Sequence, residues 1–315
     1  MGRAMINIRG PGGGRSPLAG PLLACIAVSA SLAPSGTAAA GLDRWRVSGL
    51  IASVARELQQ PVAGVHVHFA DPSDYLRAGD GRGGISVDLS TLVGRIGGEL
   101  AAPLDFLRAM KISREAAFVL SQGEMATTLH ALPERETLCV VFPRAAPLGL
   151  AQLASNLSGR NESERLVGQT FVAADFFRFL LYHEAAHCAE DAWHFRSAEF
   201  SAYDSYLAES RADAFAVLMH VRRTCDDNLP RFVAGLRQAG LHHRGDETHQ
   251  TSAVIGPTLA FAMNLQMTRM LAGRTVAELL FAARVLVERH ALGRETFARQ
   301  GGATFKRRRQ VVNMR

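Results

Sequence analysis

The stretch that decides the fold lies past the middle of the chain, where residues 171–191 read FVAADFFRFLLYHEAAHCAED. Phe176, Leu180, His183 and His187 recur at spacings of four, three and four residues, which is the period of one helix face. Apolar side chains precede the first of these histidines. We therefore predict a buried helix that carries two histidines on one face.

The string His183-Glu184-Ala185-Ala186-His187 has the spacing of a zinc site. Helix residues four apart lie about 40° apart around the axis and roughly 6 Å along it, so both imidazoles can bind one ion. Catalytic zinc accepts such ligands and keeps one position for water. Glu184 points in another direction from the helix and can serve as general base toward that water. A surface helix with ion-paired histidines is the alternative interpretation.

A third ligand is expected on the next predicted helix, residues 200–223, which contains Glu209-Ser210-Arg211-Ala212-Asp213-Ala214. Apolar residues surround this string, and carboxylates in such a setting are usually paired or metal-bound. Glu209 is the predicted ligand. Asp213 lies one turn later on the same face, where it can accept a hydrogen bond from a ligand histidine and fix its orientation. A solvated helix face is the alternative.

His-Glu-x-x-His followed by Glu-x-x-x-Asp resembles the gluzincin class of zinc peptidases. The alanines of the second string are similar to those of the HtpX and CAAX-prenyl endopeptidase group, and the resemblance covers about residues 171–219. It implies that a strand before the histidine helix, here residues 137–142, holds the backbone of a peptide substrate. The site residues that it implies are the Zn²⁺ ligands His183, His187 and Glu209, the base Glu184, and Asp213 beside a ligand.

That group of enzymes also carries a Thr-His-Pro string after the third ligand. Thr248-His249-Gln250 matches its first two residues, and His249 directly precedes a predicted helix. The resemblance therefore implies that His249 is catalytic and stabilises the oxyanion that forms when a carbonyl is attacked. Solvated loop histidines are the alternative. The other candidates for this role come from neighbouring parts of the chain: His242, His243, Tyr203 and Tyr206.

Strand patterns precede the histidine helix and helical patterns follow it. Strands are expected at residues 64–69, 117–120 and 137–142. Helices are expected at residues 42–60, 89–110, 200–223, 230–240, 251–271 and 275–290, with helix and loop at 148–161 and a loop at 71–84. This order predicts an α+β fold, a mainly helical zincin-like metallopeptidase domain with a few early strands.

Two local patterns add expectations before the histidine helix. The first helix carries one apolar face, formed by Trp45, Leu50, Ile51, Val54 and Leu58. In the first strand, His66 and His68 share one face because side chains alternate along a strand. We expect these histidines to face solvent, with metal binding as the alternative.

The first forty residues resemble an export signal. Arg3, Arg9 and Arg15 precede an apolar stretch at residues 18–32, and small residues end it at Ala38-Ala39-Ala40. We predict a signal peptide at residues 1–40 and a metallopeptidase domain at residues 41–315, with its catalytic core at about 137–272. The exported protein would be periplasmic or secreted. An uncleaved anchor, or a lipoprotein modified at Cys25, is the alternative.

Composition sets the class of the mature chain. The full chain has 315 residues, of which 48% are hydrophobic and 20% charged, and this suffices for a sizeable core. The formal charge is +6, much of it in the signal and in the basic run at residues 306–309, so we expect no nucleic-acid partner. After the signal, the sequence has no second apolar stretch long enough for a membrane span, so we expect none in the mature protein.

Three cysteines remain after the signal: Cys139, Cys188 and Cys225. They allow at most one disulfide. Cys188 and Cys225 are not expected to pair, because Cys225 lies about 24 Å beyond Glu209 along a continuous helix, whereas bridged Cα atoms lie within about 7 Å.

The sequence therefore predicts a zinc-dependent peptidase that acts on a peptide or protein through a zinc-activated water, with Glu184 as base. A zinc-dependent hydrolase of a non-peptide substrate is the first alternative. A non-catalytic zincin-like binding domain is the second.

Overall fold

The computed structural model describes residues 41–58, 65–78, 85–100, 104–105, 107, 109–114, 125–132, 136–145, 148–158, 166, 169–194, 201–244 and 248–299 of the chain. The predicted signal at 1–40, the predicted strand at 117–120 and the basic run at 306–309 lie outside these residues.

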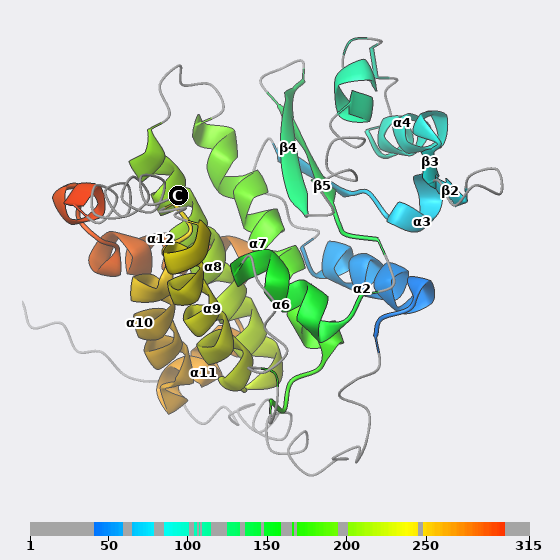
Figure 1. Cartoon of the computed structure of the whole chain (residues 1–315). Coiled ribbons are helices and arrows are strands. Elements are labelled where there is room, and N and C mark those ends of the chain that lie inside the picture. Colours follow the sequence, from blue (N-terminus) through cyan, green and yellow to red (C-terminus); the bar gives the residue numbers. More distant parts are fainter. Residues whose placement is uncertain are drawn as a thin grey trace, which may run out of the picture. The chain divides into compact units, whose positions relative to one another are not determined.

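Helices dominate the described part of the chain (Figure 1). They are α2 (Arg44–Glu57), α3 (Pro72–Tyr75), α4 (Leu89–Glu99), α6 (Leu150–Ser158), α7 (Ala173–His194), α8 (Ala202–Thr224), α9 (Asn228–Arg244), α10 (Ser252–Met263), α11 (Leu265–Ala272) and α12 (Val276–His290). The strands are β1 (Val65–Phe69), β2 (Leu76–Ala78), β3 (Ile85–Val87), β4 (Ala126–Ala131) and β5 (Thr137–Phe142). The arrangement is mainly helical with a small sheet, which agrees with the α+β prediction.

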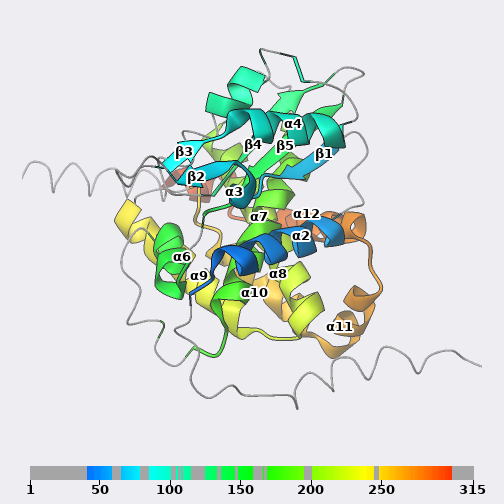
Figure 2. The ribbon, with the colours of Figure 1, turned by 90° about the vertical axis from the view of Figure 1, so that its right-hand side faces the viewer.

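The main sheet has the strand order β1-β5-β4, with β1 parallel and β4 antiparallel to β5. Side chains alternate between its faces. Leu138 and Val140 of β5 pack with Leu92 and Ile96 of α4 on one face. The other face of the sheet packs on α7, and Figure 2 shows α4 and α7 on opposite sides of the sheet.

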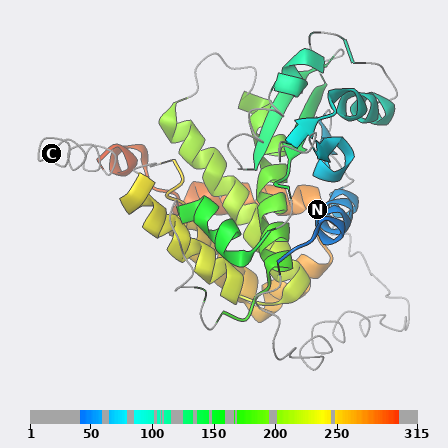
Figure 3. The ribbon, with the colours of Figure 1, turned by 45° about the vertical axis from the view of Figure 1, so that its right-hand side comes forward.

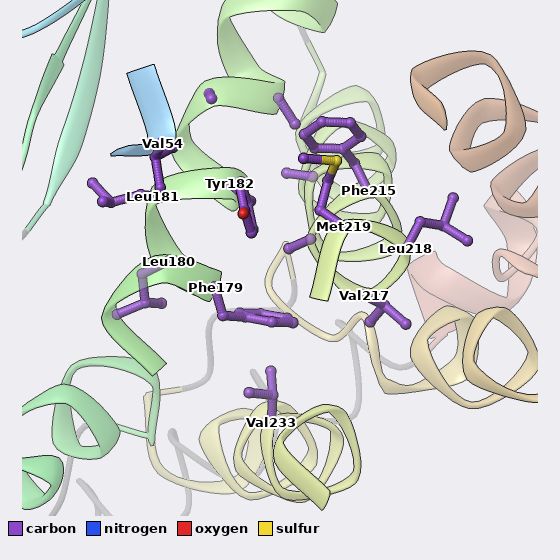
Figure 4. Packing of buried hydrophobic residues seen from close by; sticks show 14 of the residues in the cluster. Val54, Phe179, Leu180, Leu181, Tyr182, Phe215, Val217, Leu218, Met219 and Val233 are labelled. Carbon is purple, nitrogen blue, oxygen red and sulfur yellow. The ribbon is translucent and has the colours of Figure 1, made fainter. Parts of the chain in front are cut away.

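The histidine helix α7 lies between the sheet and α8 (Figure 1). Figure 3 shows the sheet and α4 above, and the helices that follow α7 below. Phe179 of α7, Met219 of α8 and Val233 of α9 belong to one buried cluster (Figure 4). α7 is therefore buried on several sides, as its apolar sequence predicts.

The sequence predicts β5 and the second site helix closely, and it misplaces other boundaries. The predicted helix at 251–271 is two helices, because the backbone of Asn264 is extended between α10 and α11. The predicted loop at 71–84 contains α3 and β2 in its described part, since Asp71 caps the helix by accepting from Ser73 N–H. β4 has no counterpart among the predicted strands.

Two predicted surfaces are wrong at one residue each, Trp45 and His68. Trp45, expected on the apolar face of the first helix, is 85% exposed, and Val47 takes its place in the core beside Ile51 and Val54. His66 is exposed and pairs with Glu136, but His68 is buried. His66 and His68 share the face of the sheet that packs on α4, and of the two only His66 is exposed to solvent.

Candidate metal centre

The two histidines of α7 face the same point, as a helical spacing of four residues requires. Their Nε2 atoms lie 3.2 Å apart, and the residues are only 5% and 9% exposed. Neutral imidazoles can hold one shared proton between them, but two Nε2 atoms turned to one point also form half of a metal site.

Glu209 of α8 completes a group of three possible ligands. Its Oε2 lies 3.4 Å from His183 Nε2, and its Oε1 lies 3.5 Å from His187 Nε2. One ligand atom from each of the three residues falls within 4.8 Å of the others. The predicted ligands His183, His187 and Glu209 therefore come together and could hold a metal ion.

The surroundings fit a cation. Glu209 Oε2 is buried and has no hydrogen-bond partner among the described residues, although His183 and Arg237 approach it. With neutral histidines, the state that binds a metal, the carboxylates of Glu209 and Asp213 face one guanidinium, that of Arg237, so the buried cluster keeps one negative charge. A divalent cation at the three ligand atoms would neutralise that charge and give Oε2 a partner.

Asp213 fixes the orientation of His183, as predicted. His183 Nδ1 donates to Asp213 Oδ1 at 2.8 Å, which leaves Nε2 directed at the ligand point. Arg237 of α9 donates to both Asp213 oxygens, from Nε at 2.8 Å and from its terminal nitrogen at 2.9 Å. Thr251 Oγ1, at the start of α10, donates to Asp213 Oδ2. One carboxylate thus joins groups from α7, α9 and α10 to α8.

Charge compensation decides the protonation of this cluster. Burial opposes the charged form of each group, but Arg237 and His183 hold the pKa of Asp213 well below its usual range. Burial likewise opposes ionisation of Glu209, but the neighbouring histidines hold its pKa well below the ordinary value. Asp213 and Glu209 in turn raise the pKa of His183 against the effect of burial. Both carboxylates are therefore anionic, and that of Glu209 is available to a cation.

His249 lies beside the ligands on the loop before α10. Its Nε2 is 3.3 Å from Glu209 Oε1, and its side chain is 43% exposed. Thr248 Oγ1 lies 3.2 Å from its Nδ1. Because Thr251 on the same loop is bonded to Asp213, the loop is held against the centre. His249 therefore lies next to Glu209, at the edge of the ligand group.

Glu184 stands apart from the three ligands, as its position in the helix requires. Its carboxylate Oε2 accepts a hydrogen bond from Thr127 Oγ1 of β4 at 2.8 Å, and the same hydroxyl lies 3.1 Å from the Glu184 carbonyl oxygen. Among the described residues, no other side chain hydrogen-bonds this carboxylate. Glu184 therefore lies between α7 and the sheet.

A disulfide fastens α7 to the sheet immediately after His187. Cys139 of β5 and Cys188 of α7 are bonded, with Cα atoms 5.4 Å apart. Cys225 is outside this bond, which confirms that Cys188 and Cys225 do not pair. The alternation of β5 explains the partner, because Cys139 faces α7 while Leu138 and Val140 face α4.

Some predicted roles do not fit the structure. β5 lies between β1 and β4, so its edges are occupied and it cannot pair with a substrate, contrary to the implied role of residues 137–142. Tyr206 OH accepts a hydrogen bond from Leu292 N–H, and Tyr203 OH donates one to the Leu292 carbonyl. Both tyrosines, the other candidates for the oxyanion donor, therefore bind the backbone that follows α12. The side chains of His242 and His243 lie outside what the structure describes.

Sequence reasoning missed three residues of the centre: Thr127, Arg237 and Thr251. None belongs to a motif, and each reaches the site from an element remote in sequence. The two β-branched threonines of residues 126–131 are a weak strand signal, but a threonine in a strand carries no sign of its partner. Arg237 gave one weak signal, an arginine beside Leu236 on a helix face that packs inward.

Comparison with protein-family models, with curated proteins and with solved structures finds no match for this chain.

Proposed function

We propose that this protein is a zinc-dependent peptidase of the gluzincin type. The observation that carries the proposal is the convergence of His183, His187 and Glu209 on one point, with Glu184 beside them but outside the ligand group. A structural metal site has no use for a further carboxylate held next to the ligands, whereas hydrolysis requires a base.

The sheet favours a peptide over a small substrate. Among the described residues, β4 pairs on one side only, with β5, so it is an edge strand of the sheet. β4 also contacts α7 and holds Glu184 through Thr127. An extended peptide that pairs with this edge would lie beside the base, because strand addition to a sheet edge supplies backbone hydrogen bonds. The substrate strand in this proposal is β4, in place of β5.

Each residue of the centre then has one task. A zinc ion, when bound, would acidify a water molecule and polarise the scissile carbonyl. His183, His187 and Glu209 would hold the ion, with Asp213 fixing the ring of His183. Glu184 would take the proton of the attacking water and pass it to the leaving amine. His249 would donate to the oxyanion.

Export completes the proposal. The signal-like residues 1–40 and the bond between Cys139 and Cys188 both favour an oxidising compartment, since disulfides persist outside the cytoplasm. None of the described helices is long and apolar enough to cross a membrane.

The proposal is tested on purified protein prepared without chelator. Metal analysis should give about one zinc per chain. A peptide-library digest should show cleavage by the wild type that a chelator stops and that added zinc restores. Glu184→Gln is the matched control: it should keep zinc and fold but lose nearly all hydrolysis, because an amide cannot accept the proton.

The outcomes separate the alternatives. Zinc without cleavage of any peptide, but with hydrolysis of esters or other small substrates that depends on Glu184, would favour a non-peptide hydrolase. Zinc with no turnover would favour a binding domain. If metal analysis finds no metal in the protein purified without chelator, the proposal is wrong.

A further inference from the structure

The carboxylate of Glu184 depends on a residue that comes from the edge strand. Thr127 Oγ1 lies 2.8 Å from Glu184 Oε2, and β4 is the strand from which it projects. A free glutamate side chain samples many rotamers, and fixing one costs conformational entropy. Thr127 therefore supplies, in this chain, the contact that keeps the carboxylate in one place.

The hydroxyl has one proton and two acceptors within reach. The Glu184 carbonyl oxygen is 3.1 Å away, and the carboxylate oxygen is nearer and charged. Hydrogen bonds to ionised acceptors are the stronger kind. The proton therefore goes to the carboxylate, while the contact with the carbonyl keeps the hydroxyl close to the helix backbone.

The register of β4 explains why this residue reaches α7. Thr127 is paired with Val141, and Leu129 is paired with Cys139, the residue bonded to Cys188 of α7. Thr127 and Leu129 are two residues apart, so they share the face of the sheet that packs on α7. The disulfide between Cys139 and Cys188 holds this same face against the helix.

We propose that Thr127 is a positioning residue that fixes the general base Glu184 for attack and links it to the edge strand on which a substrate would pair. The inference rests on the proposed peptidase function. The side chain of Thr127 points to α7, whereas a paired substrate would bond to the backbone of β4 in the plane of the sheet. Loss of the hydroxyl should therefore misplace the base and leave substrate pairing intact.

Thr127→Val removes the hydroxyl at nearly constant shape, and Thr127→Ser keeps it. We expect Thr127→Val to lower kcat by roughly 10- to 100-fold, the range for one hydrogen bond to a charged group. KM and zinc content should stay near the wild-type values. Thr127→Ser should recover most of kcat.

Crystal structures of the metal-free variants provide a readout that does not need activity. We expect the Glu184 carboxylate to keep its wild-type position in Thr127→Ser and to leave it in Thr127→Val. Wild-type kcat in Thr127→Val, an equal loss in both variants, or an unmoved carboxylate in Thr127→Val would overturn the inference. If the wild type cleaves no peptide, the proposed function fails, and the two crystal structures still decide the role of Thr127.

Discussion

At the scale of single residues, His249 lies against the ligand group without belonging to it. Its contact with Glu209 Oε1 at 3.3 Å and its half-exposed side chain leave it open to a substrate. A metal ligand and an oxyanion donor respond differently to truncation. Loss of a ligand removes the metal, whereas loss of the donor removes only stabilisation of the transition state.

We therefore expect His249→Ala to lower kcat about 10²- to 10³-fold while zinc content stays unchanged, the usual size for loss of one oxyanion donor. Steady-state kinetics and metal analysis on the same sample check both parts. His66→Ala, which removes an exposed histidine paired with Glu136, is the control and should change neither. Loss of zinc in His249→Ala would assign His249 to the support of Glu209 instead.

His220 is a buried histidine that plays no part in the site. It is 4% exposed, its Nε2 has no hydrogen-bond partner among the described residues, and its ring lies edge-on to Phe179. Burial lowers its pKa below the ordinary 6.5, outweighing the opposite effect of Asp175 and Asp226. The folded protein thus resists protonation that the unfolded chain accepts.

This difference predicts how stability depends on pH. Above pH 6.5 His220 is neutral in both states, and as pH falls below 6.5 the unfolded state takes up the proton first. The free energy of unfolding should then fall by at most about 1.4 kcal/mol per pH unit from this residue. Urea unfolding of the metal-free protein between pH 7 and 5 gives the free energy of unfolding at each pH. This free energy should fall less steeply with decreasing pH in His220→Phe than in the wild type. An equal slope would show that His220 does not contribute. The exposed His290→Asn is the control and should keep the wild-type slope.

At the scale of elements, the packing of α7 on the sheet decides the geometry of the site. The Cys139–Cys188 disulfide and the Thr127–Glu184 hydrogen bond both cross this contact. On the opposite side of α7, Asp213 of α8 holds the ring of His183. The ligands are thus fixed from one side and the base from the other.

Closing this loop of the chain should stabilise the domain. A bridge with a sequence separation of 49 restricts the unfolded chain, and loss of a native bridge typically costs about 2–5 kcal/mol. Reductant should therefore lower the Tm of the metal-free wild type. The Cys139→Ala, Cys188→Ala double variant should start at that lower Tm and not respond to reductant. A wild-type Tm that reductant leaves unchanged, with both thiols shown to be reduced, would contradict the prediction.

At the scale of the whole molecule, the residues before Gly41 are expected to be removed. Full-length protein expressed in a Gram-negative host should be recovered from the periplasm or medium, with an N-terminus near Gly41 and a Cys139–Cys188 bond. N-terminal sequencing and disulfide mapping of the same sample check this. An N-terminus at Met1 or Met5, in the cytoplasm, would contradict export.

Local spacing accounts for the part of the site that could be predicted. His183 and His187 face one point because both lie on one helix, and Asp213 follows Glu209 by one helical turn. The relative positions of residues on one helix stay the same whatever the helix packs against. The apolar residues around both strings also predict that these helices are buried, and both are.

The sequence by itself determined the residues that can bind a metal, the helices that carry them and a strand at residues 137–142. Only the tertiary structure decided that this strand is central and β4 forms the edge, that Cys139 meets Cys188, and that Thr127 and Arg237 reach the site. Helical periodicity is a property of neighbours within a few residues. Contacts between elements depend on which faces pack, and no local pattern encodes that choice.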